Sequence, residues 1–203
     1  STSSSACEGE HQFTYTAVGD ENEGFTFLVI EASDVAGNRA DETRDLSFDF
    51  SPPALTVIAF NPPNVREGMT ATLLLTANEP LAGAGDDLTS APALTWIDDK
   101  NLEYEVTGRT TFGFEYQISV EGVVDGLYAI ATVENLEDAV GNKSTIDVSD
   151  LDGTQLTKST ELAVDSQIPT VMGLNLNTSK LSTNDGFNTL TVTFTASENA
   201  AEG

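Results

Sequence analysis

The sequence predicts an all-β protein, and two observations support this prediction. Several segments are rich in β-branched and aromatic residues and alternate apolar with polar side chains, as strands with one buried face do. No segment keeps a helical period for the dozen or so residues that a helix requires. The expected strands are FTYTAV, FTFLVIEA, ALTVIAF, TATLLLTA, FEYQISV, LYAIATV and LTVTFTA.

Turn residues bound each expected strand. Because Gly, Asn, Asp and Pro accommodate the backbone conformations of tight turns, the strands should run back and forth along the chain. The turn segment GDENEG separates FTYTAV (13–18) from FTFLVIEA (25–32), and EGVVDG separates FEYQISV (114–120) from LYAIATV (127–133). SPP and NPPN lie on the two sides of ALTVIAF (54–60). LAGAGDD follows TATLLLTA (70–77), and NDG precedes LTVTFTA (190–196).

The charge of the chain limits its partners. It has 203 residues, of which 33 are acidic and 8 are basic, so its net charge is −25. Such a surface repels nucleic acid and anionic lipid and attracts cations, so neither nucleic-acid binding nor membrane insertion is expected. The single cysteine, Cys7, and the single histidine, His11, are too few for a structural zinc site or a Cys/His nucleophile pair.

The sequence also repeats itself in three places and in the same order. The segment from Phe13 to Asn38 parallels that from Phe114 to Asn142, DFSPPALTV from Asp49 parallels DSQIPTVMG from Asp165, and GMTATLLLTANEP parallels GFNTLTVTFTASEN. The distance from Asp49 to Asp165 sets a period of 165 − 49 = 116 residues. We therefore expect one complete domain at 53–168, the second half of a preceding domain at 1–52, and the first part of a following domain at 169–203.

Three short motifs carry a resemblance to a known family. They are the linkers Asp49–Pro53 and Asp165–Pro169, the segments TANEP (76–80) and TASEN (195–199), and the turns DVAGN (34–38) and DAVGN (138–142). In these motifs the chain resembles the bacterial Ig-like domains that occur in tandem in large surface proteins and adhesins. The resemblance implies tandem Ig-like Greek-key β-sandwich domains, one complete and two partial, at an extracellular or cell-surface location.

The topology of such a sandwich predicts a calcium site. The loop between the second and third strands and the loop between the sixth and seventh lie at the end where the chain enters. Glu79, Asp138 and the linker residue Asp49 should therefore converge, with the acidic GDENEG loop of the preceding half-domain facing them. Such carboxylates repel one another, and Ca²⁺ prefers ligands of this kind. The same logic assigns Asp165 and Glu198 to the next junction and Asp34 to the preceding one.

Simpler interpretations remain beside this one. The acids could be solvated surface groups or an adaptation to a saline habitat. In DVAGN and DAVGN, glycine can take positive φ, asparagine tolerates the left-handed region and aspartate can accept backbone N–H bonds, so a hairpin turn needs no ligand.

The predicted function is that of a non-catalytic structural or adhesive repeat, stiffened by Ca²⁺ at domain junctions. Its partners would be neighbouring Ig-like domains of the same or adjacent chains, with a protein or glycan ligand bound through other regions. No carboxylate pair stands out as catalytic, so an enzyme is not expected. The alternatives are an accessory module of a secreted hydrolase or a subunit of a self-assembling surface layer or filament. In an assembly, however, the two partial domains would supply only 52 + 35 = 87 residues of the 116-residue period.

Overall fold

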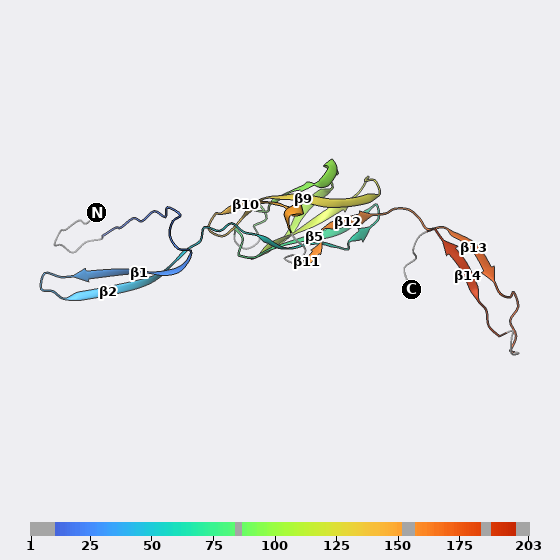
Figure 1. Cartoon of the computed structure of the whole chain (residues 1–203), viewed down its shortest axis with the longest axis horizontal. Helices are drawn as coiled ribbons and strands as arrows, with labels where there is room; N and C mark the ends of the chain where they lie inside the picture. The colour runs from blue at the N-terminus through green and yellow to red at the C-terminus, as the bar shows by residue number, and fades with distance from the viewer. Residues whose placement is uncertain (1–10, 84–86, 152–156, 184–187, 198–203) are drawn as a thin grey trace.

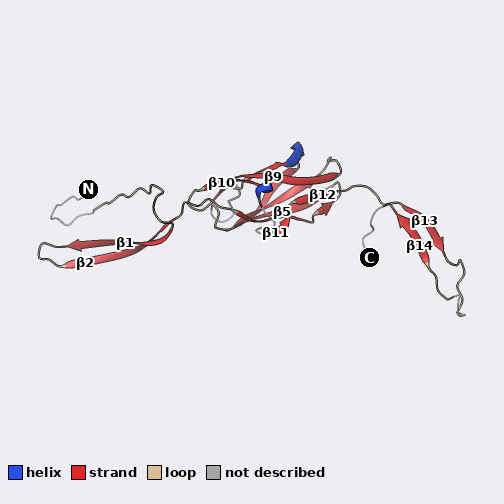
Figure 2. Cartoon of the chain, in the orientation of Figure 1, coloured by secondary structure: helices blue, strands red, loops and turns tan. Residues whose placement is uncertain are grey.

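The computed structural model describes residues 11–83, 87–151, 157–183 and 188–197, and it confirms the all-β prediction. These residues form fourteen strands and two short 3₁₀ helices, η1 (Ile97–Asp99) and η2 (Val148–Asp150), without an α-helix (Figure 2). Accordingly, none of them belongs to a helix long and apolar enough to cross a membrane.

The chain is arranged as three successive units along an extended molecule (Figure 1). The first is a hairpin of β1 (Gly24–Ser33) and β2 (Arg39–Phe48), and the last is a hairpin of β13 (Val171–Leu176) and β14 (Val192–Ala196). A sandwich of two sheets lies between them and contains strands β3 to β12. The two hairpins therefore lie at opposite ends of the molecule.

The sandwich pairs its strands in the order β11-β3-β5-β8-β7 in the first sheet and β10-β9-β12-β4 in the second, where β6 pairs with the other side of β9. The bounds of these strands are β3 Leu55–Asn61, β4 Asn64–Val65, β5 Met69–Ala77, β6 Ala93–Trp96, β7 Glu103–Thr110, β8 Gly113–Val120, β9 Gly126–Glu137, β10 Lys143–Asp147, β11 Thr157–Ser159 and β12 Glu161–Val164.

This order places the first, second, fifth and fourth long strands in one sheet and the third, sixth and seventh in the other, as in a Greek-key β-sandwich. The first and last strands both change sheets, since β3 continues as β4 and β11 continues as β12. At the opposite side of the sandwich, β7 and β6 are the edge strands.

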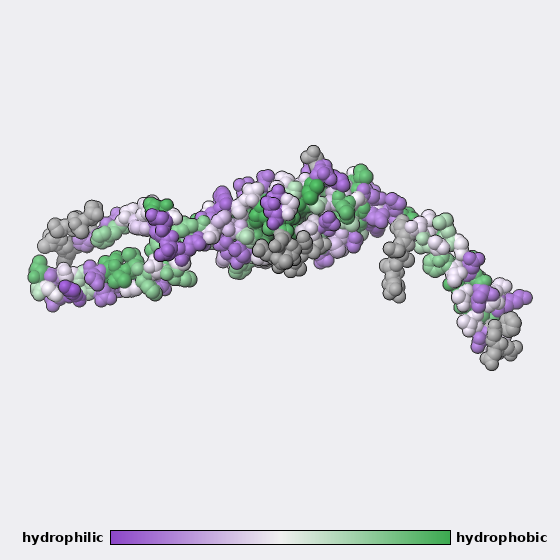
Figure 3. Space-filling model, in the orientation of Figure 1, coloured by the Kyte–Doolittle hydropathy of each residue, from purple (hydrophilic) through white to green (hydrophobic). Residues whose placement is uncertain are grey.

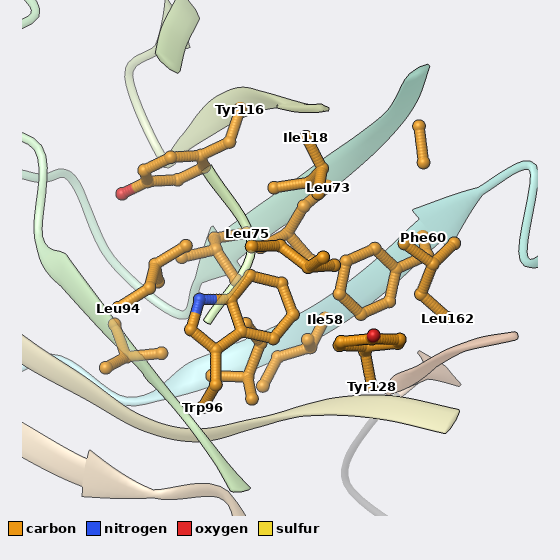
Figure 4. Packing of buried hydrophobic residues seen from close by; sticks show 14 of the residues in the cluster. Ile58, Phe60, Leu73, Leu75, Leu94, Trp96, Tyr116, Ile118, Tyr128 and Leu162 are labelled. Atoms are coloured by element: carbon orange, nitrogen blue, oxygen red, sulfur yellow. The ribbon is translucent and has the colours of Figure 1, made fainter. Parts of the chain in front are cut away.

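Side chains that alternate along the strands fill the space between the two sheets. On β5, Leu73 and Leu75 are almost completely buried, whereas Leu74 between them remains 39% exposed. They pack with apolar residues of both sheets, and Trp96 stacks on Phe60 with ring centroids 6.1 Å apart (Figure 4). The single tryptophan is thus a core residue, and its fluorescence reports on the sandwich alone.

The two end hairpins bury almost nothing, although their sequences alternate as those of the sandwich do. Every residue of β1 is exposed, and so is every residue of β13. The predicted strand FTYTAV (13–18) is wrong, because these residues form no strand in the structure. A strand needs a partner edge, and in this unit only β1 and β2 pair with each other. With one hairpin at each end, the tandem repetition and the domain boundaries stay predictions.

The contrast between Leu73 and Leu74 predicts their effects on stability. We expect Leu73→Ala to lower the free energy of unfolding of the sandwich by about 2–5 kcal/mol, because it removes buried apolar volume from a packed core. Leu74→Ala, the matched control on the outer face, should cost less than about 1 kcal/mol. Urea denaturation followed by Trp96 fluorescence measures both, and equal losses would contradict the inward and outward assignment.

Candidate functional site

The turn DAVGN, which joins β9 to β10, is built around a buried carboxylate. Asp138 is only 1% exposed, and its Oδ1 accepts hydrogen bonds from the backbone N–H groups of Val140, Gly141 and Asn142 at 2.9, 2.7 and 2.8 Å. Gly141 has a φ of +101°, a conformation that favours glycine. The three N–H bonds stabilise the charged form of a group that would otherwise be costly to bury.

Asn142 has a role that the sequence analysis missed. Its φ is not positive, and neither is that of Asn38, so neither residue uses the left-handed conformation that asparagine tolerates. Its side-chain amide instead donates to Asp138 Oδ2 at 2.7 Å and to the backbone oxygens of Asp49 at 3.2 Å and Ser51 at 3.4 Å. The turn thereby holds the linker through which the chain enters the sandwich.

The loop after β5 packs against the same turn. Leu81 forms an isolated β-bridge with Asp138, and the N–H of Ala139 donates to the backbone oxygen of Pro80 at 3.1 Å. Glu79 immediately precedes this pair, so its side chain reaches the entry end of the sandwich. Two loops that are far apart in the sequence therefore meet at the linker.

Asp49, Glu79 and Asp138, which we call the junction triad, are brought together in this way. One carboxylate oxygen from each lies within 4.8 Å of the other two. Asp49 is exposed, Glu79 is partly buried and Asp138 is buried, so the cluster opens to solvent on one side. The predicted convergence of these three residues therefore agrees with the structure, while metal binding stays a prediction.

Glu79 experiences the repulsion within the junction triad. Its pKa is raised above the ordinary value of 4.5, first by partial burial and then by the negative charges of Asp49, Asp138 and Glu23. No hydrogen bond to its carboxylate is seen in the described part of the chain that would offset this repulsion. Glu79 is thus the member of the triad that a cation would relieve most.

Glu23 reaches the same junction from the first unit, and its carboxylate, unlike that of Glu79, is hydrogen-bonded. Its Oε1 accepts from the backbone N–H of Phe50 at 2.7 Å and from the hydroxyl of Ser51 at 2.8 Å. The bond from Phe50 is the main reason that the pKa of Glu23 lies below its usual value. Glu23 therefore attaches the first unit to the linker. Glu21 accepts instead from Tyr15 and from the N–H groups of Val18 and Gly19.

The other three predicted metal residues do not join a cluster in the described part of the chain. Asp165 is exposed in the second linker, where its Oδ1 accepts the N–H of Gln167 at 3.0 Å. Asp34 lies in the turn of the first hairpin, where its Oδ1 accepts the N–H of Asn38 at 2.8 Å and its Oδ2 accepts the side-chain amide of Asn38 at 2.6 Å. Glu198 lies outside the described residues.

The donor set of the junction triad suits a hard cation that keeps part of its hydration shell. Oδ1 of Asp138 already accepts three bonds and Oδ2 accepts one, from the Asn142 amide, so Oδ2 is the oxygen with more remaining capacity. Asp49 accepts one N–H bond on Oδ1, from Ser51, and Glu79 offers both oxygens. With one oxygen from each side chain, the triad supplies three of the six to eight ligands that Ca²⁺ prefers, and water would complete the shell on the open side.

The same hydrogen bonds recur where the sequence repeats. Asp34 and Asn38 reproduce the backbone and side-chain bonds between Asp138 and Asn142. The N–H of Ala54 donates to Asn78 Oδ1 at 2.8 Å, as that of Thr170 donates to Ser197 Oγ at 3.0 Å. The N–H of Phe50 donates to Glu23, as that of Ser166 donates to Asp125.

No protein-family model, curated protein sequence or solved structure matches the chain. The fold itself therefore defines the class, which is that of all-β proteins with a Greek-key sandwich.

The buried environment of Asp138 predicts a large effect on stability. We expect Asp138→Ala to lower the free energy of unfolding of the sandwich by about 2–4 kcal/mol, because it leaves three backbone N–H groups without their acceptor. Asp34→Ala removes the equivalent carboxylate from the exposed turn and should change that free energy by less than about 0.5 kcal/mol. Urea denaturation monitored by Trp96 fluorescence compares the two, and a small loss for Asp138→Ala would refute the structural role of this carboxylate.

The raised pKa of Glu79 predicts a pH dependence of stability. Between its unfolded value near 4.5 and its higher folded value, the folded state binds more protons, so the Glu79 contribution to stability falls as the pH rises. In EDTA at about pH 7, Glu79→Gln should therefore be more stable than the parent by a few tenths to about 1 kcal/mol. The gain should shrink as the pH falls and vanish at about pH 3, where Glu79 is protonated in both states. A destabilised Glu79→Gln at neutral pH would contradict the assigned repulsion.

Proposed function

We propose that the chain is a section of an array of Ig-like β-sandwich repeats in an extracellular or cell-surface protein, where it acts as a non-catalytic spacer stiffened by Ca²⁺ at the domain junction. The observation that carries this proposal is the junction triad. Its three carboxylates come from the linker, from the loop after β5 and from the turn after β9, so one cation there would fix the linker against the sandwich.

The repeated hydrogen bonds support the array. The turn, the linker and the end of the second strand each occur twice in the chain, and each pair makes the same bonds around residues of the same or similar type. Local geometry that recurs in the same order is typical of a structural repeat that contacts mainly its neighbours.

The junction can transmit stiffness because both sides of the linker are held. On one side Glu23 bonds Phe50 and Ser51, and on the other side Asn142 bonds the backbone oxygens of Asp49 and Ser51. A cation bound by Asp49, Glu79 and Asp138 would add a further connection at the same point and remove the repulsion between the three charges. The neighbouring repeats are thus the partners that this end of the sandwich serves.

Calcium binding is tested by thermal unfolding of the 203-residue chain in excess EDTA and in about 1–10 mM Ca²⁺, the range of weak extracellular sites. We expect Ca²⁺ to raise the Tm of the transition that Trp96 reports, because the ion binds only the folded junction. Asp49→Asn and Glu79→Gln should each abolish most of the rise. Asp138 is unsuitable for this comparison because it also builds the turn.

Glu105→Gln is the matched control, since it removes one exposed carboxylate from β7 while leaving the junction triad intact. It should keep the full Ca²⁺ response. Small-angle X-ray scattering of the same samples measures stiffness, and the distribution of maximum dimensions should narrow when Ca²⁺ is added. An equal Tm in both buffers, or a rise that survives in Glu79→Gln, would refute the junction site.

A further inference from the structure

The further inference concerns Arg109, which lies near the end of β7 and contacts the loop that carries Glu79. We propose that Arg109 is the positioning residue of the junction triad, because its guanidinium fixes this loop and thereby keeps Glu79 beside Asp138 before any ion binds. This inference rests on the proposed function, in which the triad holds Ca²⁺, but the effect of Arg109 on the loop can be measured without an ion.

Arg109 is directed at the backbone of the loop. Its Nη2 donates to the backbone oxygens of Leu81, Ala82 and Gly83 at 2.9, 2.5 and 2.9 Å. The guanidinium carbon also lies 5.6 Å from the centroid of the Phe114 ring. Hydrogen bonds from a charged donor are stronger than those from a neutral one, and the aromatic ring attracts the cation. The side chain is therefore held on a core ring while it binds three consecutive carbonyl groups.

The N–H groups of the same loop are bonded to the sandwich. That of Leu81 donates to the backbone oxygen of Thr111 at 2.9 Å, and that of Ala82 donates to the backbone oxygen of Glu137 at 2.8 Å. Arg109 therefore supplies a donor for the acceptor groups of a loop whose own donors are already paired. Leu81 is only 3% exposed, so its oxygen would have little access to water if the guanidinium were removed, and an unpaired buried carbonyl is costly.

Gly83 and Ser90 complete this arrangement. Ser90 Oγ donates to the backbone oxygen of Ala82 at 3.1 Å. Gly83 has a φ of +94°, and a Cβ at this position would lie 2.8 Å from Ser90 Oγ and 3.3 Å from Arg109 Cζ. A side chain there would be strained and would displace the groups that bind the loop. The glycine therefore lets the guanidinium approach the backbone closely.

The fixed loop determines where Glu79 lies. Pro80 restricts the backbone conformation of the residue before it, and the backbone oxygen of Pro80 accepts an N–H from the turn after β9. The next residue, Leu81, is bridged to Asp138 and bound by Arg109. Glu79 therefore has little freedom to leave the triad while the loop stays in place.

Without this restraint, repulsion would separate the carboxylates. Asp49, Asp138 and Glu23 all place negative charge near Glu79. Figure 3 shows hydrophilic residues on the surface where the first unit meets the sandwich, so a carboxylate that moved outwards would be received by water. A free loop would thus let Glu79 leave the cluster. A site whose ligands are already in place binds more tightly, since less ordering is needed when the ion binds.

Charge and position predict opposite effects for the loss of Arg109. A positive charge near the triad disfavours a second cation, so its removal would strengthen Ca²⁺ binding on electrostatic grounds alone. Removal of a positioning residue would weaken binding, because Glu79 would leave its place. The direction of the change in Kd therefore distinguishes the two roles.

The first test is amide hydrogen exchange of the 203-residue chain in excess EDTA. Arg109→Met keeps an unbranched side chain over Phe114 but removes the charged donor. We expect the amides of Ala82 and Ala139, which hold the loop to the β9–β10 turn region, to exchange about 10-fold faster, as the loss of one hydrogen bond to a charged group allows. The amide of Val140, which is bonded within the turn, should be unchanged.

Arg109→Lys is the conservative variant, because an ammonium group carries three N–H donors. It should restore part of the protection of Ala82 and Ala139. Unchanged exchange at these two amides in Arg109→Met would overturn the proposal. Acceleration that is equal throughout the sandwich would overturn it as well, since Arg109 would then serve only general stability.

The second test is the Kd for Ca²⁺, measured by isothermal titration calorimetry. We expect Arg109→Met to raise the Kd by about 10-fold, in the direction opposite to the electrostatic effect. Arg66→Met is the matched control, because it removes the same charge shortly before β5, at the end of that strand away from Glu79. Its Kd should equal that of the parent or fall slightly.

An unchanged or lower Kd for Arg109→Met would contradict the positioning role. A parent that binds no Ca²⁺ would instead refute the proposed function. The exchange measurement in EDTA would still decide whether Arg109 fixes the loop, so the two failures are distinguishable.

Discussion

The burial of the Asp138 carboxylate is the constraint on which the entry end of the sandwich depends. A buried charge is tolerated only when hydrogen bonds replace the lost hydration, and three backbone N–H groups and the Asn142 amide do so here. These bonds fix the turn, the turn fixes the amide of Asn142, and the amide fixes the linker. The position of Asp49 beside Glu79 is therefore a consequence of how one charge is stabilised.

Comparison of the two copies of this turn shows which of its features depend on its own residues and which depend on the surrounding sandwich. Asp34 and Asn38 form the same bonds in an exposed hairpin that Asp138 and Asn142 form in the sandwich, so the turn is encoded in its own five residues. Burial is not encoded there, since it requires the loop after β5, which the first hairpin lacks. An isolated hairpin is marginal in water, and its local order must be completed by other strands.

The difference between local features and features that need distant residues also explains which predictions from the sequence succeeded. Alternation and turn residues identified the long strands β3, β5, β8 and β9 of the sandwich but not β6, β7, β10 or β12. The expected Greek-key order placed Asp49, Glu79 and Asp138 at one end, and the structure brings them together. The strand predicted at 13–18 failed because a strand depends on an edge elsewhere in the chain, which no local pattern records. The bonds of Asn142 to the linker were missed for a similar reason, since their acceptors lie 93 and 91 residues away.

Glu23 and Glu79 lie at the same junction but differ in how their charge is stabilised. Glu23 is stabilised by a backbone N–H and a hydroxyl, and its pKa falls, whereas Glu79 is partly buried and faces other carboxylates, and its pKa rises. The bonds of Glu23 connect two units without any ion, so this connection does not depend on a cation. The repulsion around Glu79 is not offset by hydrogen bonds, so a cation at the junction would bind there favourably by reducing it. A joint of this kind would be formed in dilute buffer and stiffened only where divalent ions are abundant, as they are outside cells.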